Sequence, residues 1–144
     1  MKRAMMLIGV VLIFLFMAIT SDARYTKKPI TLDDLPAMKR KWQGDRQFKD
    51  IRITGNYPVD LEINNDKLPL QGKLTLHNVK AAGQRERTET IGLKNSEINQ
   101  EGNLVIKTQS MQIELSLYTD DDKMKLEGDY TFQGGQATLS VKKK

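Results

Sequence analysis

The chain of 144 residues contains no cysteine and only one histidine. The lack of cysteine excludes a disulfide framework, a thiolate metal site and a cysteine nucleophile. The single histidine, His77, has no residue pattern beside it that would build a Ser-His-Asp triad or a histidine metal site. We therefore expect a protein that is not an enzyme and that has no catalytic residues, no metal ligands and no cofactor.

The chain also has little excess of charge of either sign, because it contains 23 basic and 18 acidic residues and its net charge is only +5. The basic residues are not gathered into a stripe with interleaved aromatic side chains, and aromatic residues make up 6% of the chain. This pattern argues against nucleic acid as a partner.

The only long hydrophobic run lies at the N-terminus, where Lys2 and Arg3 precede the uncharged residues 4–19. A positive segment followed by an apolar run of this length is typical of an export signal, although it is just short of the ~20 residues that span a bilayer comfortably. Small residues at Ser21 and Ala23 fit cleavage after Ala23. If the run is retained instead, it is a single-pass anchor with the remainder outside the cytoplasm.

These observations predict residues 1–23 as a signal peptide or signal anchor. The expected location is the cell membrane, facing the periplasm or the extracellular side, or a secreted state if the signal is cleaved. The membrane is then a partner through the N-terminal segment.

Residues 24–47 are predicted as a basic linker with a short helix. Acidic Asp33 and Asp34 come early and the basic residues 39–41 come late, which suits a helix that ends at residues 42–44. This helix can cover one end of the next domain with its apolar side chains, or hold its basic residues against anionic lipid headgroups. Its apolar residues are Leu35, Met38 and Trp42.

Residues 48–144 are predicted as an antiparallel β domain, because apolar residues recur there with a period of two. Leu70, Leu74 and Leu76 share one face, and His77 takes the other. Eight strands are expected near 49–56, 58–64, 68–78, 85–94, 95–99, 103–108, 110–119 and 123–132, with a ninth element at 136–142. Short connections leave no room for crossover helices, so the fold class is an all-β antiparallel meander of about eight strands, preceded by an N-terminal hydrophobic helix and the short helix.

Glycines 55, 72 and 128 fall on the inward face of these strands, where they favour bends in a strongly curved sheet. Closure into a barrel removes exposed strand edges, so we expect a closed barrel rather than an open sandwich.

Several segments resemble the small calycin-type barrels, the relatives of avidin and the lipocalins. They are Gly55-Asn56-Tyr57, the run LQGKLTL at 70–76, the run KMKLEGDY at 123–130 and the run GQATLSV at 135–141. The resemblance implies an up-and-down barrel after a short helix. Lipocalins have Gly-x-Trp where this chain has Tyr57, and the pocket tryptophans of avidins are missing, so the resemblance implies no biotin binding and no particular ligand residues.

Two functions remain open. The first is a membrane-tethered interaction or assembly module that contacts a protein partner at the membrane through its outer surface. The second is a periplasmic or extracellular carrier of a small apolar, lipid-like molecule inside the barrel. The residues expected to line such a cavity are Leu70, Leu74, Leu76, Met111, Ile113, Leu115, Met124, Leu126 and Tyr130.

Three charged runs are better explained by structure than by function. The acidic residues 120–122 lack the alternate spacing of a calcium loop and predict a solvated hairpin turn. The basic residues 142–144 are expected to fray. The alternating charges of residues 85–89 indicate an exposed strand face.

Overall fold

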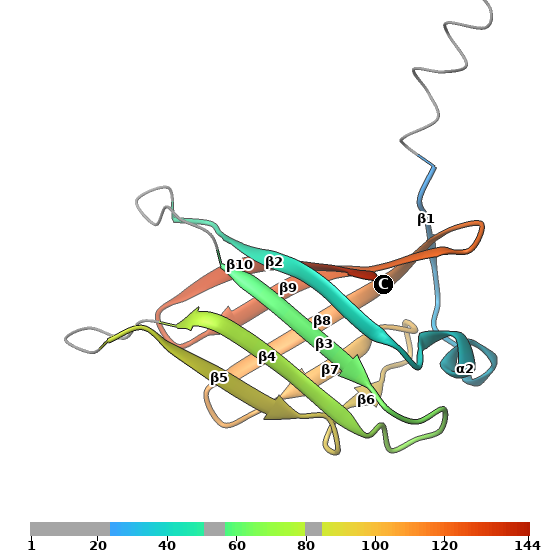
Figure 1. The fold of residues 1–144 in the computed structure, drawn as a ribbon, viewed down its shortest axis with the longest axis horizontal. Coiled ribbons are helices and arrows are strands. Elements are labelled where there is room, and N and C mark those ends of the chain that lie inside the picture. The colour runs from blue at the N-terminus through green and yellow to red at the C-terminus, as the bar shows by residue number, and fades with distance from the viewer. Residues whose placement is uncertain (1–23, 51–56, 80–84) are drawn as a thin grey trace, which may run out of the picture.

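A single antiparallel sheet makes up most of the structure. The computed structural model describes residues 24–50, 57–79 and 85–144. Within these residues the strand order is β5-β4-β3-β2-β10-β9-β8-β7-β6, and β1 pairs with β8 (Figure 1). The strands are β1 (Thr26–Lys28), β2 (Lys41–Phe48), β3 (Pro58–Ile63), β4 (Gly72–Val79), β5 (Arg87–Gly92), β6 (Glu97–Ile98), β7 (Leu104–Lys107), β8 (Met111–Asp120), β9 (Lys123–Phe132) and β10 (Gly135–Lys143). The prediction of an all-β antiparallel fold is confirmed.

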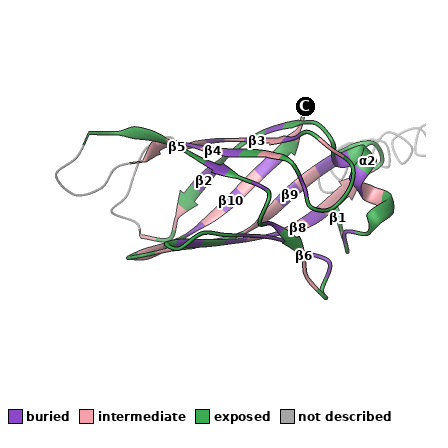
Figure 2. Ribbon diagram, turned by 90° about the horizontal axis from the view of Figure 1, so that it is seen from below, coloured by how far each residue is buried: buried purple, intermediate pink, exposed green. Residues whose placement is uncertain are grey.

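The sheet consists of two meanders that meet along one seam. Strands β2 to β5 pair in chain order, strands β6 to β10 do the same, and β2 pairs with β10. Figure 2 shows the two arms of the curled sheet, with β3, β4 and β5 facing β8. Among the described residues β5 and β6 do not pair with each other, so the sheet is a strongly curled half-barrel. The expected closure into a complete barrel is not confirmed.

The concave side of the half-barrel is filled with apolar side chains. Burial alternates along β8, where Met111, Ile113, Leu115 and Leu117 are buried and the residues between them are exposed or half-buried. All nine residues expected to line a cavity are buried, with exposed fractions of 9% or less, whereas Leu68, which the same period places on that face, is exposed. The prediction of which side chains face inward is confirmed for these strands.

The predicted helix is shorter than expected. A 3-10 turn η1 (Leu32–Asp34) leads into α2 (Leu35–Met38), and β2 begins at Lys41. Trp42 therefore lies on a strand, and its indole Nε1–H donates to the carbonyl of Met38 at 3.1 Å. The strand was missed because two inward positions of β2 are Gly44 and Arg46, which hide its apolar alternation.

This correction also moves the start of the β domain. Residues 24–47 were predicted as a linker before a domain at 48–144, but they supply β1 and nearly all of β2. Strand β2 lies in the middle of the sheet between β3 and β10. The strand expected at 49–56 falls mostly on residues 51–56, which lie outside the described residues.

The predicted signal or anchor at 1–23 also lies outside the described residues. In the described ranges, none of the helices has both the length and the apolar character that crossing a bilayer requires.

One end of the half-barrel, here called the helix end, is covered by η1 and α2 (Figure 1). Leu35, Met38 and Trp42 are buried there with exposed fractions of 1% or less, as expected for a lid. Asp34 holds η1 in place, because its Oδ2 accepts hydrogen bonds from Lys28 Nζ at 2.5 Å and from the Thr31 amide at 2.8 Å. The opposite end, where β2 ends and the turns β7–β8 and β9–β10 lie, is called the hairpin end.

Glycine is required at two positions where the backbone of a neighbouring strand comes very close. A Cβ on Gly44 would lie 1.7 Å from the Ser140 carbonyl oxygen, and a Cβ on Gly128 would lie 1.9 Å from that of Glu114. Real Cβ atoms do not approach backbone this closely, so any side chain would force neighbouring strands apart. Gly128 was predicted as a bending position, whereas Gly44 was not.

Replacement of Gly128 by alanine is therefore expected to destabilise the fold by about 1–3 kcal/mol or more, since a methyl group must displace strand β8. Urea unfolding, followed by the fluorescence of the single tryptophan, measures the change. Gly92→Ala is the matched control, because no atom lies within 4 Å of the position of its added Cβ. Equal stability of the two variants would contradict the close approach at Gly128.

Asp34→Asn is expected to lower stability by about 1 kcal/mol at neutral pH, as the loss of a helix-capping side chain does. Partial burial alone raises the pKa of Asp34, but hydrogen bonds from Lys28 and Thr31 outweigh it and lower the pKa below its usual value. The carboxylate thus stabilises the fold above the unfolded-state pKa near 4, and the contribution disappears as the pH falls through the lower folded pKa. The difference between Asp34→Asn and wild type in urea melts should shrink from pH 7 to pH 3.

Asp33→Asn is the control for this experiment, because Asp33 is an exposed neighbour that makes none of these contacts. A pH-independent loss of stability in Asp34→Asn would show that the charge of Asp34 is not what matters.

Candidate functional site

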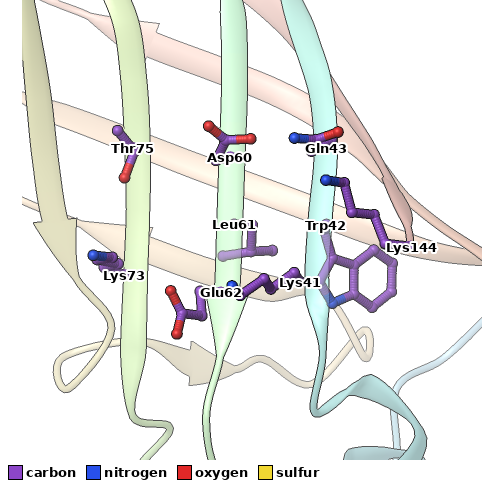
Figure 3. A pocket seen from close by; sticks show the side chains of 9 residues that line it. All are labelled: Lys41, Trp42, Gln43, Asp60, Leu61, Glu62, Lys73, Thr75 and Lys144. Atoms are coloured by element: carbon purple, nitrogen blue, oxygen red, sulfur yellow. The ribbon is translucent and has the colours of Figure 1, made fainter.

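The outer face of strands β2, β3 and β4 is hollowed near the helix end (Figure 3). The hollow, here called the β2–β4 groove, has a volume of about 320 Å³. It is lined by Lys41, Trp42, Gln43, Asp60, Leu61, Glu62, Lys73, Thr75 and Lys144. A second hollow of about 450 Å³ adjoins it towards the hairpin end and shares Gln43 and Asp60 with it.

Strand register sets the charges of the groove in rows. Lys41 lies opposite Glu62, and Glu62 lies opposite Lys73. Figure 3 shows the Glu62 carboxylate between the two lysines. In the next row Asp60 stands between Gln43 and Thr75. The face therefore carries cations on both sides of a central strand whose side chains are anionic.

The lysines of the groove are not neutralised at close range. Among the described residues, Lys41, Lys73 and Lys144 form no ion pair within 4.0 Å. Asp60, by contrast, is engaged, because its Oδ2 lies 2.7 Å from Nε2 of His77. His77 points outward, as the alternation predicted, and extends the polar surface towards the second hollow.

A second cluster lies on the inner face at the hairpin end. It consists of Arg46, Phe48, Tyr57, Tyr130 and Phe132, and is called the Arg46 cluster. The guanidinium carbon is 5.6 Å from the ring centres of Phe48 and Tyr57 and 6.0 Å from that of Tyr130. The rings also pack on one another, with Tyr130 stacked on Phe132 at 5.0 Å. Aromatic faces attract a cation, and a desolvated contact contributes about 2 kcal/mol.

Arg46 is the most unusual residue of the inner face. Its exposed fraction is 3%, and Nη2 donates to the backbone carbonyl of His77. Its Nε has no hydrogen-bond partner. Burial lowers the pKa of Arg46, and Tyr130 makes the largest contribution that raises it in part. Burial likewise raises the pKa of the Tyr130 phenol.

Acidic neighbours of Arg46 do not reach ion-pair distance. No described Asp or Glu lies within 4.0 Å of the guanidinium. Glu89 of β5 acts from farther away, since its negative charge raises the pKa of Arg46. The undescribed segments 51–56 and 80–84 contain no Asp or Glu in their sequences. Among the residues that the structure describes, Arg46 is therefore a buried cation without a close anion.

The nine predicted cavity-lining residues lie in the packed core, and Tyr130 alone of them belongs to the Arg46 cluster. Neither the β2–β4 groove nor the adjoining hollow is lined by any of the nine. Their role as ligand contacts remains a prediction.

The three charged runs have clear structural positions. Residues 120–122 form the end of β8 and the tight turn to β9, with Asp121 at φ 51°. Within the described ranges no group of three or more potential metal ligands comes together. The expectation that residues 142–144 fray is wrong, because Lys143 pairs with Trp42 and the Lys144 amide donates to the Lys41 carbonyl. Residues 85–88 are exposed as expected, whereas Glu89 is half-buried.

Sequence reasoning missed both Arg46 and the groove. Arg46 fell in the predicted linker, although Trp42 and Phe48 stand four residues before and two residues after it, on the same face of a strand. This even spacing of two aromatic residues around Arg46 was the sequence signal for a strand with Arg46 on its inner face. The groove had no local signal, because it depends on the register of three strands.

The chain was compared with protein-family models, curated proteins and solved structures, and none of the three comparisons finds a match.

Proposed function

We propose that this chain is an exported, membrane-tethered and non-enzymatic β domain that acts as an interaction or assembly module. The observation that carries the proposal is the β2–β4 groove, a hollowed and charged strip on the outer face of the half-barrel. The contact surface in this proposal is the groove, and the partner is a protein that presents acidic side chains to it.

The charges of the groove support an acidic partner. Lys41, Lys73 and Lys144 bring three cations to the groove, against the two carboxylates of Asp60 and Glu62. Asp60 already has His77 as a partner, so the surplus is positive. Complementary charges speed encounter and fix register more than they add affinity, which suits a module that must find one partner at a membrane.

The position of the groove fits the predicted tether. Lys41 begins β2, and Lys73 lies at the start of β4, so both are near the helix end. The chain also enters the sheet there through β1, which directly follows the predicted signal or anchor. A retained anchor would hold the groove close to the membrane surface, on the periplasmic or extracellular side.

Photocrosslinking in native membranes tests this function. A photoreactive residue at position 43, in the groove, is expected to give a discrete adduct with one membrane-associated protein. The same residue at position 112 is the matched control, because Gln112 is an exposed glutamine on the outer face of the opposite arm. The adduct from position 43 should fall at least tenfold in Lys41→Glu/Lys73→Glu, in which the charges repel an acidic partner.

Both groove lysines are exposed, so the double variant should keep its thermal midpoint. Equal adducts from positions 43 and 112, or an adduct that survives the double charge reversal, would refute the groove as the contact surface.

A second candidate function is the carrier of a small apolar, lipid-like molecule. The Arg46 cluster favours it, because an interior that served packing alone would gain little from a buried cation without a close anion. In this proposal the half-barrel closes around its ligand as a complete barrel does. Native mass spectrometry of gently purified protein, followed by organic extraction, would detect a stoichiometric apolar adduct.

A further inference from the structure

We propose that the Arg46 cluster binds the carboxylate of a single-chain amphiphile. This inference rests on the carrier, the second candidate function, and adds the chemical class of the ligand's polar end. It is independent of the β2–β4 groove.

One guanidinium nitrogen of Arg46 is buried without a hydrogen-bond acceptor. Arg46 is 3% exposed, and its Nε–H has no acceptor. Its Nη2 donates to the His77 carbonyl, and the Tyr130 ring lies 6.0 Å from the guanidinium carbon. A buried donor without an acceptor is disfavoured, and native proteins rarely keep one that has no use. An oxygen-bearing ligand would satisfy it.

The charge of the site selects an anion. No described carboxylate reaches Arg46, and burial of a cation without a counter-charge is costly even after the three aromatic contacts. The planar fork of N–H groups on arginine matches the two oxygens of a carboxylate. Glu89 adds a negative charge in the vicinity, which disfavours a dianion such as a phosphate monoester.

The surroundings select an apolar tail. Arg46 lies at the hairpin end beneath Phe48, Tyr57 and Phe132, which are only half-buried. Met111 pairs with Phe132 at the same end and is one of the least buried members of the core. Methionine adapts to varied shapes. The helix end, by contrast, is sealed around Trp42. A tail would therefore lie along Phe132 and Met111, with its carboxylate at Arg46.

Photoaffinity labelling of the full chain in membranes tests the inference. The probes are a diazirine-bearing dodecanoic acid and the matching diazirine-bearing dodecanol, which differ only in the polar end. Peptide mapping is expected to place the acid probe on β8 and β9 near the hairpin end, around Met111 and Phe132, with at least tenfold more labelling than the alcohol probe.

Four substitutions separate a binding role from a structural one. Arg46→Met should reduce acid labelling to the level of the alcohol, and Arg46→Lys should give an intermediate value because the charge stays and the fork is lost. Glu89→Gln should increase acid labelling, since a competing negative charge is removed. Arg40→Met is the matched control, because Arg40 is exposed at the helix end, and it should change nothing.

Thermal melts decide between a binding and a packing role for Arg46. If the cation serves a ligand, Arg46→Met should keep or raise the thermal midpoint, because an apolar side chain replaces a buried charge. If Arg46 only holds the fold together, Arg46→Met lowers the midpoint and Glu89→Gln leaves acid labelling unchanged, which overturns the inference.

The probes also distinguish failure of this inference from failure of the carrier function. If the acid and the alcohol label the protein equally and Arg46→Met changes neither, the carboxylate site is overturned. Such a result would still agree with the carrier function. Labelling of the β domain by neither probe would overturn both.

Discussion

The pairing of β2 with β10 is the contact on which the rest of the half-barrel depends. It joins the first meander to the second, from Phe48 opposite Ala137 to Trp42 opposite Lys143. The close approach at Gly44 belongs to this seam, because the Ser140 carbonyl occupies the space that a side chain would need. Strand β2 also carries Trp42 at the helix end and Arg46 at the hairpin end, so both ends of the core are built on it.

The two faces of the sheet follow opposite electrostatic rules. On the outer face, Lys41 and Lys73 flank Glu62 in solvent, where charges cost little and screening is strong. On the inner face, Arg46 is buried among aromatic rings, and no described carboxylate lies within ion-pair distance of it. Folded domains are stable by only about 5–15 kcal/mol, so an uncompensated interior charge is a substantial cost. The buried charge lies near the hairpin end, which η1 and α2 do not cover.

The sequence predicted well those elements whose side chains alternate strictly. Strands β3, β8, β9 and β10 have apolar residues at nearly every second position, so their faces could be assigned from the period alone. Strand β2 was missed because glycine and arginine occupy inward positions that the pattern expects to be apolar. Strand β1 has only three residues, and its place is set by pairing with β8 rather than by its own composition.

Features that depend on distant pairing could not be predicted in the same way. Whether a curled sheet closes is decided between β5 and β6, its two outermost strands, and no local pattern reports on that contact. The β2–β4 groove likewise needs the register of three strands before Lys41, Glu62 and Lys73 form a row. The Arg46 cluster gathers residues from β2, β9 and Tyr57, so its members are scattered in the chain.

The seam between β2 and β10 has a consequence for how the protein is made. An early strand lies beside the last one in the middle of the sheet, so the two meanders cannot join until β10 has been synthesised. At about 5–20 residues per second, the ribosome leaves β2 without this neighbour for several seconds. Pairings between distant segments also form slowly. During that interval β2 can pair with β3, but its other edge has no neighbour in the sheet.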